Sequence, residues 1–181
     1  GIADPLTLSR MSENNIQTHL NVNFIAPTLL TQQLLPQLAA GRVLFISTGL
    51  AHNASPGMFA YGTAKAALHN GWKYWKAEHP EIAFGIAQPG MVDTPIQTHL
   101  RNSSSDKLPA RQFFTDTHEK NQLLQPAIAA KFLSWLLLNT TRETFCAKEW
   151  NIYDRNHWPQ WANEEEVVVR DATLYENKAP K

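Results

Sequence analysis

The sequence predicts an α/β fold built around a parallel sheet, and three observations lead to this prediction. Short apolar segments at 43–47 and 82–87 alternate with longer segments that have helical spacing. Each short segment is apolar at consecutive positions, which is typical of parallel strands because helices cover both of their faces. Turns with hydroxyl groups or glycine follow both segments, and open α/β sheets place their ligands at this end of the strands.

The first helix is expected to start after an irregular entry at residues 1–8. Ser9 or Ser12 can cap it, and it should run toward Leu38. Pro27 should kink this helix because proline has no N–H and disrupts the hydrogen-bond ladder. The kink frees a carbonyl group in the turn that holds Asn21, Val22 and Asn23.

The helix after the first strand carries the segment Tyr61-Gly62-Thr63-Ala64-Lys65. Residues four apart on a helix share one face, so the Tyr61 phenol and the Lys65 ammonium can act at one reaction centre. A neighbouring positive charge should lower the pKa of the phenol toward neutrality. Such pairs also arise by chance on helix surfaces, so the pair needs its surroundings to indicate catalysis. Small residues recur along the same helix, at Ala60, Ala64, Ala67 and Gly71.

The rest of the chain is less regular. Residues 101–122 have little apolar periodicity and predict a mobile loop or short helices. A helix at 126–138 and a final strand at 149–153 should follow. We expect one domain over residues 1–153 and a polar extension over 154–181, in which Trp158 and Trp161 dock on the body and the tail at 163–181 is flexible or contacts a partner.

Composition excludes several classes of function. With 43% hydrophobic and 18% charged residues and a formal net charge of zero, the chain has no phosphate-binding field for nucleic acid. Its single cysteine, Cys146, cannot form an internal disulfide, and no Cys/His group has zinc spacing, so no metal site is expected. No apolar run is long enough for a membrane span and no signal peptide is apparent, so we expect a cytoplasmic protein.

The motifs together resemble the short-chain dehydrogenase/reductase family. Thr48 lies thirteen residues before Tyr61, Tyr-x-x-x-Lys follows, and the second strand runs into Gln88-Pro89-Gly90-Met91-Val92-Asp93-Thr94. The resemblance covers Gly1 to about Tyr153. It implies a Rossmann-like doubly wound parallel sheet, here the C-terminal half with strands 5-6-7 and their helices, and a chain that begins in mid-fold without the family's Gly-rich pyrophosphate turn.

The resemblance also implies a chemistry in which hydride passes from a nicotinamide to a carbonyl carbon. Tyr61 would donate the proton, Thr48 would bind the substrate oxygen, and Lys65 would hold the nicotinamide ribose. Asn23, with Asn21 as the alternative, would bind a water through its main chain. The remaining cofactor contacts would come from the turn after the second strand, at Pro89, Gly90, Val92 and Thr94.

The resemblance further implies a small-molecule carbonyl substrate and NADP as cofactor, with NAD possible. The stretches at 92–95 and 119–124 are similar to the sepiapterin reductase and benzil reductase branch, whose members reduce dicarbonyls. Phe113, Phe114 and His118 would line a substrate lid, or the aromatic pair would simply anchor this loop. The two central helices would form a homodimer or tetramer. The alternative is a truncated, non-catalytic remnant that serves as an oligomerisation module, and residues 1–181 alone are expected to bind NADP(H) weakly.

Overall fold

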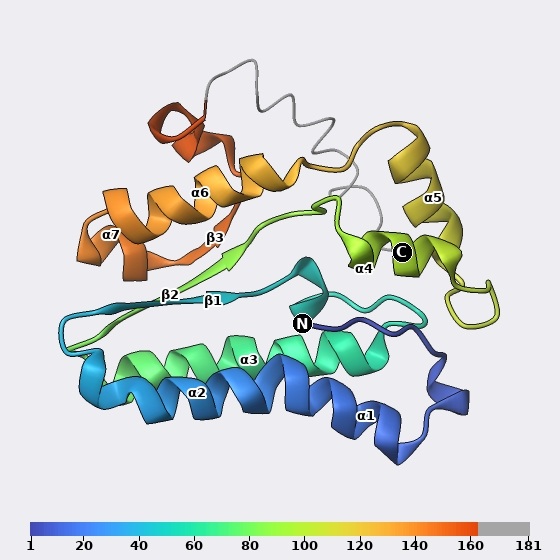
Figure 1. Cartoon of the computed structure of the whole chain (residues 1–181), viewed down its shortest axis with the longest axis horizontal. Coiled ribbons are helices and arrows are strands. Elements are labelled where there is room, and N and C mark those ends of the chain that lie inside the picture. The colour runs from blue at the N-terminus through green and yellow to red at the C-terminus, as the bar shows by residue number, and fades with distance from the viewer. Residues whose placement is uncertain (163–181) are drawn as a thin grey trace.

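The computed structural model describes residues 1–162 and contains a three-stranded sheet in the order β1-β2-β3. Both strand pairs are parallel, with Phe45 opposite Ile86 and Ala87 opposite Trp150. The strands are β1 (Arg42–Ile46), β2 (Ala83–Gln88) and β3 (Glu149–Asn151). The predicted α/β fold with a parallel sheet is therefore confirmed (Figure 1).

Helices cover both faces of this sheet (Figure 1). The α-helices are α1 (Glu13–Leu20), α2 (Ala26–Leu34), α3 (Phe59–Glu78), α4 (Pro95–Asn102), α5 (Arg111–Glu119), α6 (Pro126–Asn139) and α7 (Arg142–Ala147). The first three lie under one face, and α6 and α7 lie over the other. Helices α4 and α5 lie beyond the carboxyl ends of the strands, where ligands bind in open α/β sheets.

The predicted first helix is interrupted where proline was expected to disturb it. A π-helical segment, η2 (Asn21–Ile25), separates α1 from α2, and the Ala26 N–H donates to the carbonyl of Asn21. Ser12, and not Ser9, caps α1 by accepting from the Asn15 N–H. The helix ends at Leu34, earlier than Leu38, because Pro36 has no N–H to continue the ladder.

Strand β2 forms the centre of the core because its two faces are both buried. Phe84 and Ile86 pack with Phe45, Leu68 and Trp72 on the side of α3. The opposite face carries small residues, and the Phe145 ring of α7 lies so close to Gly85 that a Cβ there would come within 2.6 Å of it. Small residues on this face therefore let α7 approach the sheet closely.

The C-terminal part of the described chain packs on the body. Strand β3 ends at Asn151, two residues before the predicted end. Trp158 then donates its indole N–H to the Ile152 carbonyl at 2.7 Å, and Trp161 donates to His157 Nδ1 at 2.8 Å. The docking of both tryptophans is confirmed. The boundary at residue 153 stays a prediction, and the predicted tail at 163–181 lies outside the described residues.

Residues 101–122 form short helices, which is one of the two predicted outcomes. Helix α4 ends at Asn102 and α5 begins at Arg111. Leu108 and Phe114 are buried and anchor this segment to the apolar cluster that contains Met58. Over residues 1–162, none of the helices is both long and apolar enough to cross a membrane.

We predict that this chain self-associates. In the described sheet β1 pairs with β2 alone, so its outer edge presents backbone groups to a second chain. Ile46 is 37% exposed, and Val22, Leu29, Leu30 and Leu34 expose a further apolar surface along η2 and α2. Sedimentation at tens of micromolar should show a dimer or larger species, and Leu30→Glu should shift it toward monomer. A clean monomer would contradict both parts of this prediction.

Candidate active site

Tyr61 and Lys65 lie on the first two turns of α3, beneath the carboxyl end of β1. Lys65 is buried, and its Nζ donates a hydrogen bond to the Ile46 carbonyl at 2.8 Å. Gly62, between them, lets the segment after β1 approach closely, since a Cβ there would meet the Leu50 carbonyl at 3.0 Å. The end of β1 and the start of α3 are therefore held against each other.

Thr48 lies at the start of the segment that follows β1. Its backbone is extended, and it caps the short 3-10 helix η4 (Gly49–Ala51), with its Oγ1 accepting from the Leu50 N–H at 3.4 Å. This bond uses a lone pair of the hydroxyl, so the hydroxyl proton is left to donate. The Thr48 side chain also interacts with the Tyr61 phenol. The structure thus brings Thr48 and Tyr61 together, and it places Lys65 against the carbonyl of Ile46, two residues before Thr48.

The electrostatics of the pair differ from the expectation. Burial raises the pKa of Tyr61 above its ordinary value, and the hydrogen bond with Thr48 lowers it to a smaller extent. Lys65 does not contribute to this shift, and burial lowers the pKa of Lys65 itself. The prediction that Lys65 brings the phenol toward neutrality is therefore wrong for this arrangement. Tyr61 keeps its proton at neutral pH, which suits a proton donor.

Asn23 lies inside the π-helical segment and is buried. Its side chain makes two hydrogen bonds to the backbone of Ile2, donating to the carbonyl at 2.9 Å and accepting from the N–H at 3.1 Å. A Cβ on Gly1 would lie 2.4 Å from Asn23 Oδ1 and 3.9 Å from Lys65 Nζ. Asn23 is therefore close to the Lys65 ammonium, and its side chain holds the N-terminal segment in place.

The alternative residue, Asn21, is placed differently. It is exposed, and its side chain accepts a hydrogen bond from Gln17 one turn earlier at 2.9 Å. Its carbonyl already accepts from Ala26 within the π-turn. In a regular α-helix the Asn23 carbonyl would accept a hydrogen bond from the N–H of residue 27. Residue 27 is proline, which has no N–H. Of the two candidates, Asn23 is the one whose carbonyl loses its helical donor.

The turn after β2 depends on Gly90. Its φ is +80°, and a Cβ at this position would come within 2.7 Å of both the Tyr153 hydroxyl and Leu124 Cδ1. Tyr153, two residues after the end of β3, supports the same turn, since its hydroxyl accepts from the Met91 N–H at 3.0 Å. Gly90 and Pro89 therefore shape the backbone that leads into Val92.

Gly90→Ala should destabilise the protein by about 2 to 4 kcal/mol, because the left-handed backbone and the close contacts each oppose a side chain. Urea unfolding measures this change. Gly49→Ala is the matched control, since its Cβ would meet only Gln88 Oε1, at an ordinary 3.7 Å, and it should change stability little. Equal unfolding midpoints for Gly90→Ala and the unmodified chain would refute this account of the turn.

Val92 and Thr94 present polar groups at the end of this turn. The Leu124 N–H donates to the Met91 carbonyl at 2.8 Å and the Asp93 N–H donates to the Leu124 carbonyl at 2.9 Å. The backbone groups of Val92 itself therefore face away from Leu124. Thr94 is the N-cap residue of α4, and its hydroxyl makes no capping bond to the helix. Both residues can offer hydrogen bonds to a ligand.

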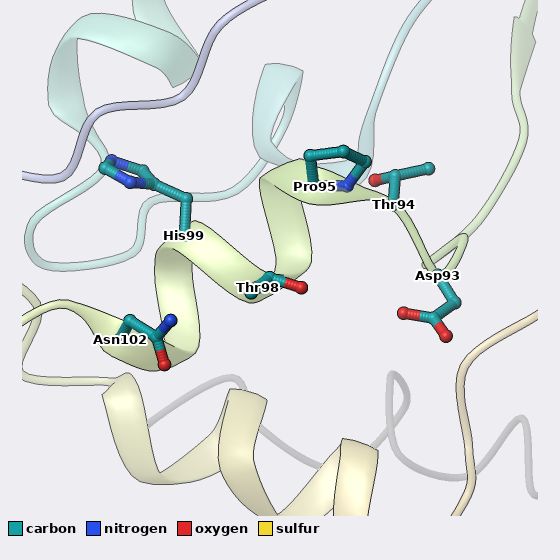
Figure 2. Close-up of a pocket in the computed structure, with 6 residues that line it drawn as sticks. All are labelled: Asp93, Thr94, Pro95, Thr98, His99 and Asn102. Carbon is teal, nitrogen blue, oxygen red and sulfur yellow. The ribbon is translucent and has the colours of Figure 1, made fainter.

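A hollow lies along α4 beside these residues (Figure 2). It is lined by Asp93, Thr94, Pro95, Thr98, His99 and Asn102. Thr94 is the one predicted site residue that lines it, and Tyr61 and Lys65 do not. His99 Nε2 lies 2.9 Å from Asp4 Oδ1, so this side of the hollow is tied to the N-terminal segment.

The predicted lid residues lie on α5. Phe114 is buried and packs with Leu100 and Leu108, and Phe113 lies at the edge of the same cluster, as does Tyr61. Phe113 therefore lies near the apolar surroundings of the phenol, while Phe114 anchors the helix. His118 is in the last turn of α5.

Two contributors to the site were not identified from the sequence. The Ile46 carbonyl, which binds Lys65, acts through its main chain, so its side chain carries no signal. Tyr153 was assigned to the final strand, and no local pattern links its hydroxyl to Met91, 62 residues away. The sequence did offer one indication, because Tyr153 lies next to the end of a predicted parallel strand, where site residues gather.

Comparisons with known proteins agree with this geometry. The family model described as short chain dehydrogenase matches residues 1–105. An uncharacterised oxidoreductase of Schizosaccharomyces pombe is 29% identical over 145 residues, covering 77% of this chain and 59% of the relative. A benzil reductase ((S)-benzoin forming) of Saccharomyces cerevisiae is 30% identical over 127 residues, covering 65% of this chain and 48% of the relative. The chain thus spans about half the length of these curated relatives.

The crystal structure of the KRED1-Pglu enzyme has the same fold. It superimposes with a TM-score of 0.77 at 28% identity, over 82% of this chain and 64% of that one. The helices on both faces of the parallel sheet therefore correspond to those of a solved structure.

Proposed function

The chain belongs to the short chain dehydrogenase family, and from this premise we propose that its protein is an NAD(P)-dependent oxidoreductase that reduces a ketone or dicarbonyl to an alcohol. The observation that carries the proposal is the convergence of Thr48, Tyr61 and buried Lys65 at the end of β1. Two segments of this chain, the one after β1 and the start of α3, meet there with a proton donor, a second hydroxyl and a positive charge, which is the set that carbonyl reduction requires.

The residues fit a nicotinamide cofactor at this end of the sheet. When bound, the cofactor supplies the hydride that reaches the carbonyl carbon. Lys65 would hold ribose hydroxyls, and the backbone of Val92 and the uncapped hydroxyl of Thr94 would hold the carboxamide. Pro89 and Gly90 would set the approach of that backbone. We propose NADP as the cofactor, with NAD as the alternative.

Proton transfer would run through Tyr61. As hydride adds to the carbonyl carbon, the oxygen gains negative charge and takes the Tyr61 phenolic proton, which completes the alcohol. The Thr48 hydroxyl would donate a hydrogen bond to the same oxygen, where it stabilises the developing charge. The raised pKa of Tyr61 keeps the proton on the phenol until it is needed. Asn23 would position a water near Lys65 through its main-chain carbonyl.

An apolar dicarbonyl is the proposed substrate. The relatives named benzil reductase act on such a compound by name. Met91 and Phe113 lie at the edge of the apolar cluster that Tyr61 also contacts, and they would favour an apolar substituent on the carbonyl. Phe113 and His118 of α5 would lie over the substrate.

The test is an NADPH oxidation assay with benzil on the protein that carries this sequence, run beside its Tyr61→Phe variant. We expect consumption of NADPH, a benzoin product and a loss of turnover in the variant. No reduction of benzil or of a panel of simple ketones, by protein that stays folded and self-associated, would favour the non-catalytic oligomerisation module instead.

A further inference from the structure

Two histidines and a glutamate from three distant segments meet at the β3 edge of the sheet. His52 follows η4, His69 lies in the middle of α3, and Glu149 begins β3 opposite Ile86. His52 Nε2 lies 2.7 Å from Glu149 Oε2, and His69 Nδ1 lies 3.4 Å from Glu149 Oε1. The two imidazole rings pack edge to face, with centroids 4.6 Å apart. We call this group the His52–His69–Glu149 cluster.

Hydrogen bonding does not account for the whole cluster. The His69 Nδ1 and Glu149 Oε1 atoms are buried, and neither has a hydrogen-bond partner among the described residues. They face each other at 3.4 Å, within ion-pair distance but at the long end of hydrogen-bond distances. Leaving two polar atoms buried in this way is unfavourable, so native structures usually satisfy them with a partner or an ion.

The spacing of the three ligand atoms suits a small metal ion. One atom from each residue lies within 4.8 Å of the other two. In a tetrahedral site with metal–ligand bonds of about 2.0 to 2.1 Å, the ligand atoms are about 3.3 Å apart, close to the separation of His69 Nδ1 and Glu149 Oε1. The His52 side chain is 40% exposed and can adjust, and it leaves the site open to solvent for a fourth ligand.

We propose that His52 Nε2, His69 Nδ1 and one carboxylate oxygen of Glu149 bind a divalent transition-metal ion, with Zn²⁺ as the representative. Two imidazoles and one carboxylate select borderline ions of this kind over Mg²⁺ and Ca²⁺, which prefer oxygen ligands. The sequence predicted no metal site because its histidines lack zinc spacing. The ligands here come from segments 17 and 80 residues apart, and only the fold brings them together.

The site would tie the two catalytic segments to the edge of the sheet. His52 is four residues after Thr48, and His69 is one helical turn after Lys65 on the same face of α3. A bound ion would therefore restrain the segment after β1, α3 and β3 together. Its role is structural, because the cluster lies apart from the Tyr61 phenol and adds no group to proton transfer.

The test is titration of the tag-free, metal-stripped protein with Zn²⁺, followed by calorimetry and thermal unfolding. We expect one ion per chain and a rise in Tm of about 5 to 10 °C at a free Zn²⁺ concentration of about one hundred times Kd. Co²⁺ should give the intense visible absorption of a tetrahedral site. Mg²⁺ at the same concentration should shift Tm by less than about 1 °C.

The variants His52→Ala and Glu149→Gln should each lower affinity by at least about tenfold and abolish the Tm shift. Both leave the fold intact, which circular dichroism checks, because His52 is exposed and glutamine keeps the shape of Glu149. His79→Ala is the matched control, since His79 pairs with Glu81 at 3.1 Å and, within residues 1–162, belongs to no group of three candidate ligands. Absence of binding at micromolar Zn²⁺, binding unchanged in Glu149→Gln, or an equal loss in His79→Ala would overturn the proposal.

Discussion

Tyr61→Phe should lower the turnover number for carbonyl reduction by about a hundredfold or more, the effect of removing a general acid. Phenylalanine keeps the ring that packs against the apolar cluster of Met58, Leu100 and Leu108, and it removes only the hydroxyl that interacts with Thr48. The free energy of unfolding should therefore change little. Because the proton transfer occurs in the transition state, KM should stay close to its original value.

Steady-state kinetics with benzil and NADPH, together with urea unfolding, measure both effects. The pH profile is a further check. Burial holds the pKa of Tyr61 above its ordinary value of 10.0, so ionisation of this phenol should not reduce the rate of reduction anywhere between pH 6 and 9. Near-normal turnover in Tyr61→Phe would show that the residue packs α3 and does not transfer the proton.

Thr48→Ala is expected to lower the turnover number by about 10² to 10³-fold, as the loss of one preorganised donor to a developing oxyanion does in other enzymes. The variant removes the hydroxyl that lies between the Leu50 N–H and the Tyr61 phenol. Some of the loss would come from a less ordered η4, because the Leu50 N–H also loses its acceptor.

Thr48→Ser separates these contributions, since it restores the hydroxyl and removes only the methyl group. Turnover should persist in this variant, with a shift toward bulkier carbonyl substrates, because the methyl no longer restricts χ1 or the space above the site. Comparing the kinetics of all three forms with several diketones provides the measurement. If serine and alanine at this position reduced turnover equally, the donor role of Thr48 would be refuted.

Local sequence patterns predicted the fold class and the shared helical face of Tyr61 and Lys65, and the family resemblance added Thr48. The apolar runs that became β1 and β2 are contiguous, and the Tyr61–Lys65 spacing places both residues on one helical face whatever surrounds them. The proline effect at Pro27 was also predictable, because the missing N–H acts within one turn. The exact ends of the first helix and of β3 could not be predicted, since they depend on neighbouring elements.

The sequence by itself determined the strands, the helix that carries Tyr61 and Lys65, and the register of Thr48, Tyr61 and Lys65, because these features depend on spacing within one segment or between consecutive ones. Only the tertiary structure decided that Lys65 binds the Ile46 carbonyl, that Tyr153 supports the Met91 turn, and that the His52–His69–Glu149 cluster forms. The direction of the Tyr61 pKa shift also depended on the fold. Burial and contacts between distant segments are set by packing, and packing leaves no periodic signal in the sequence.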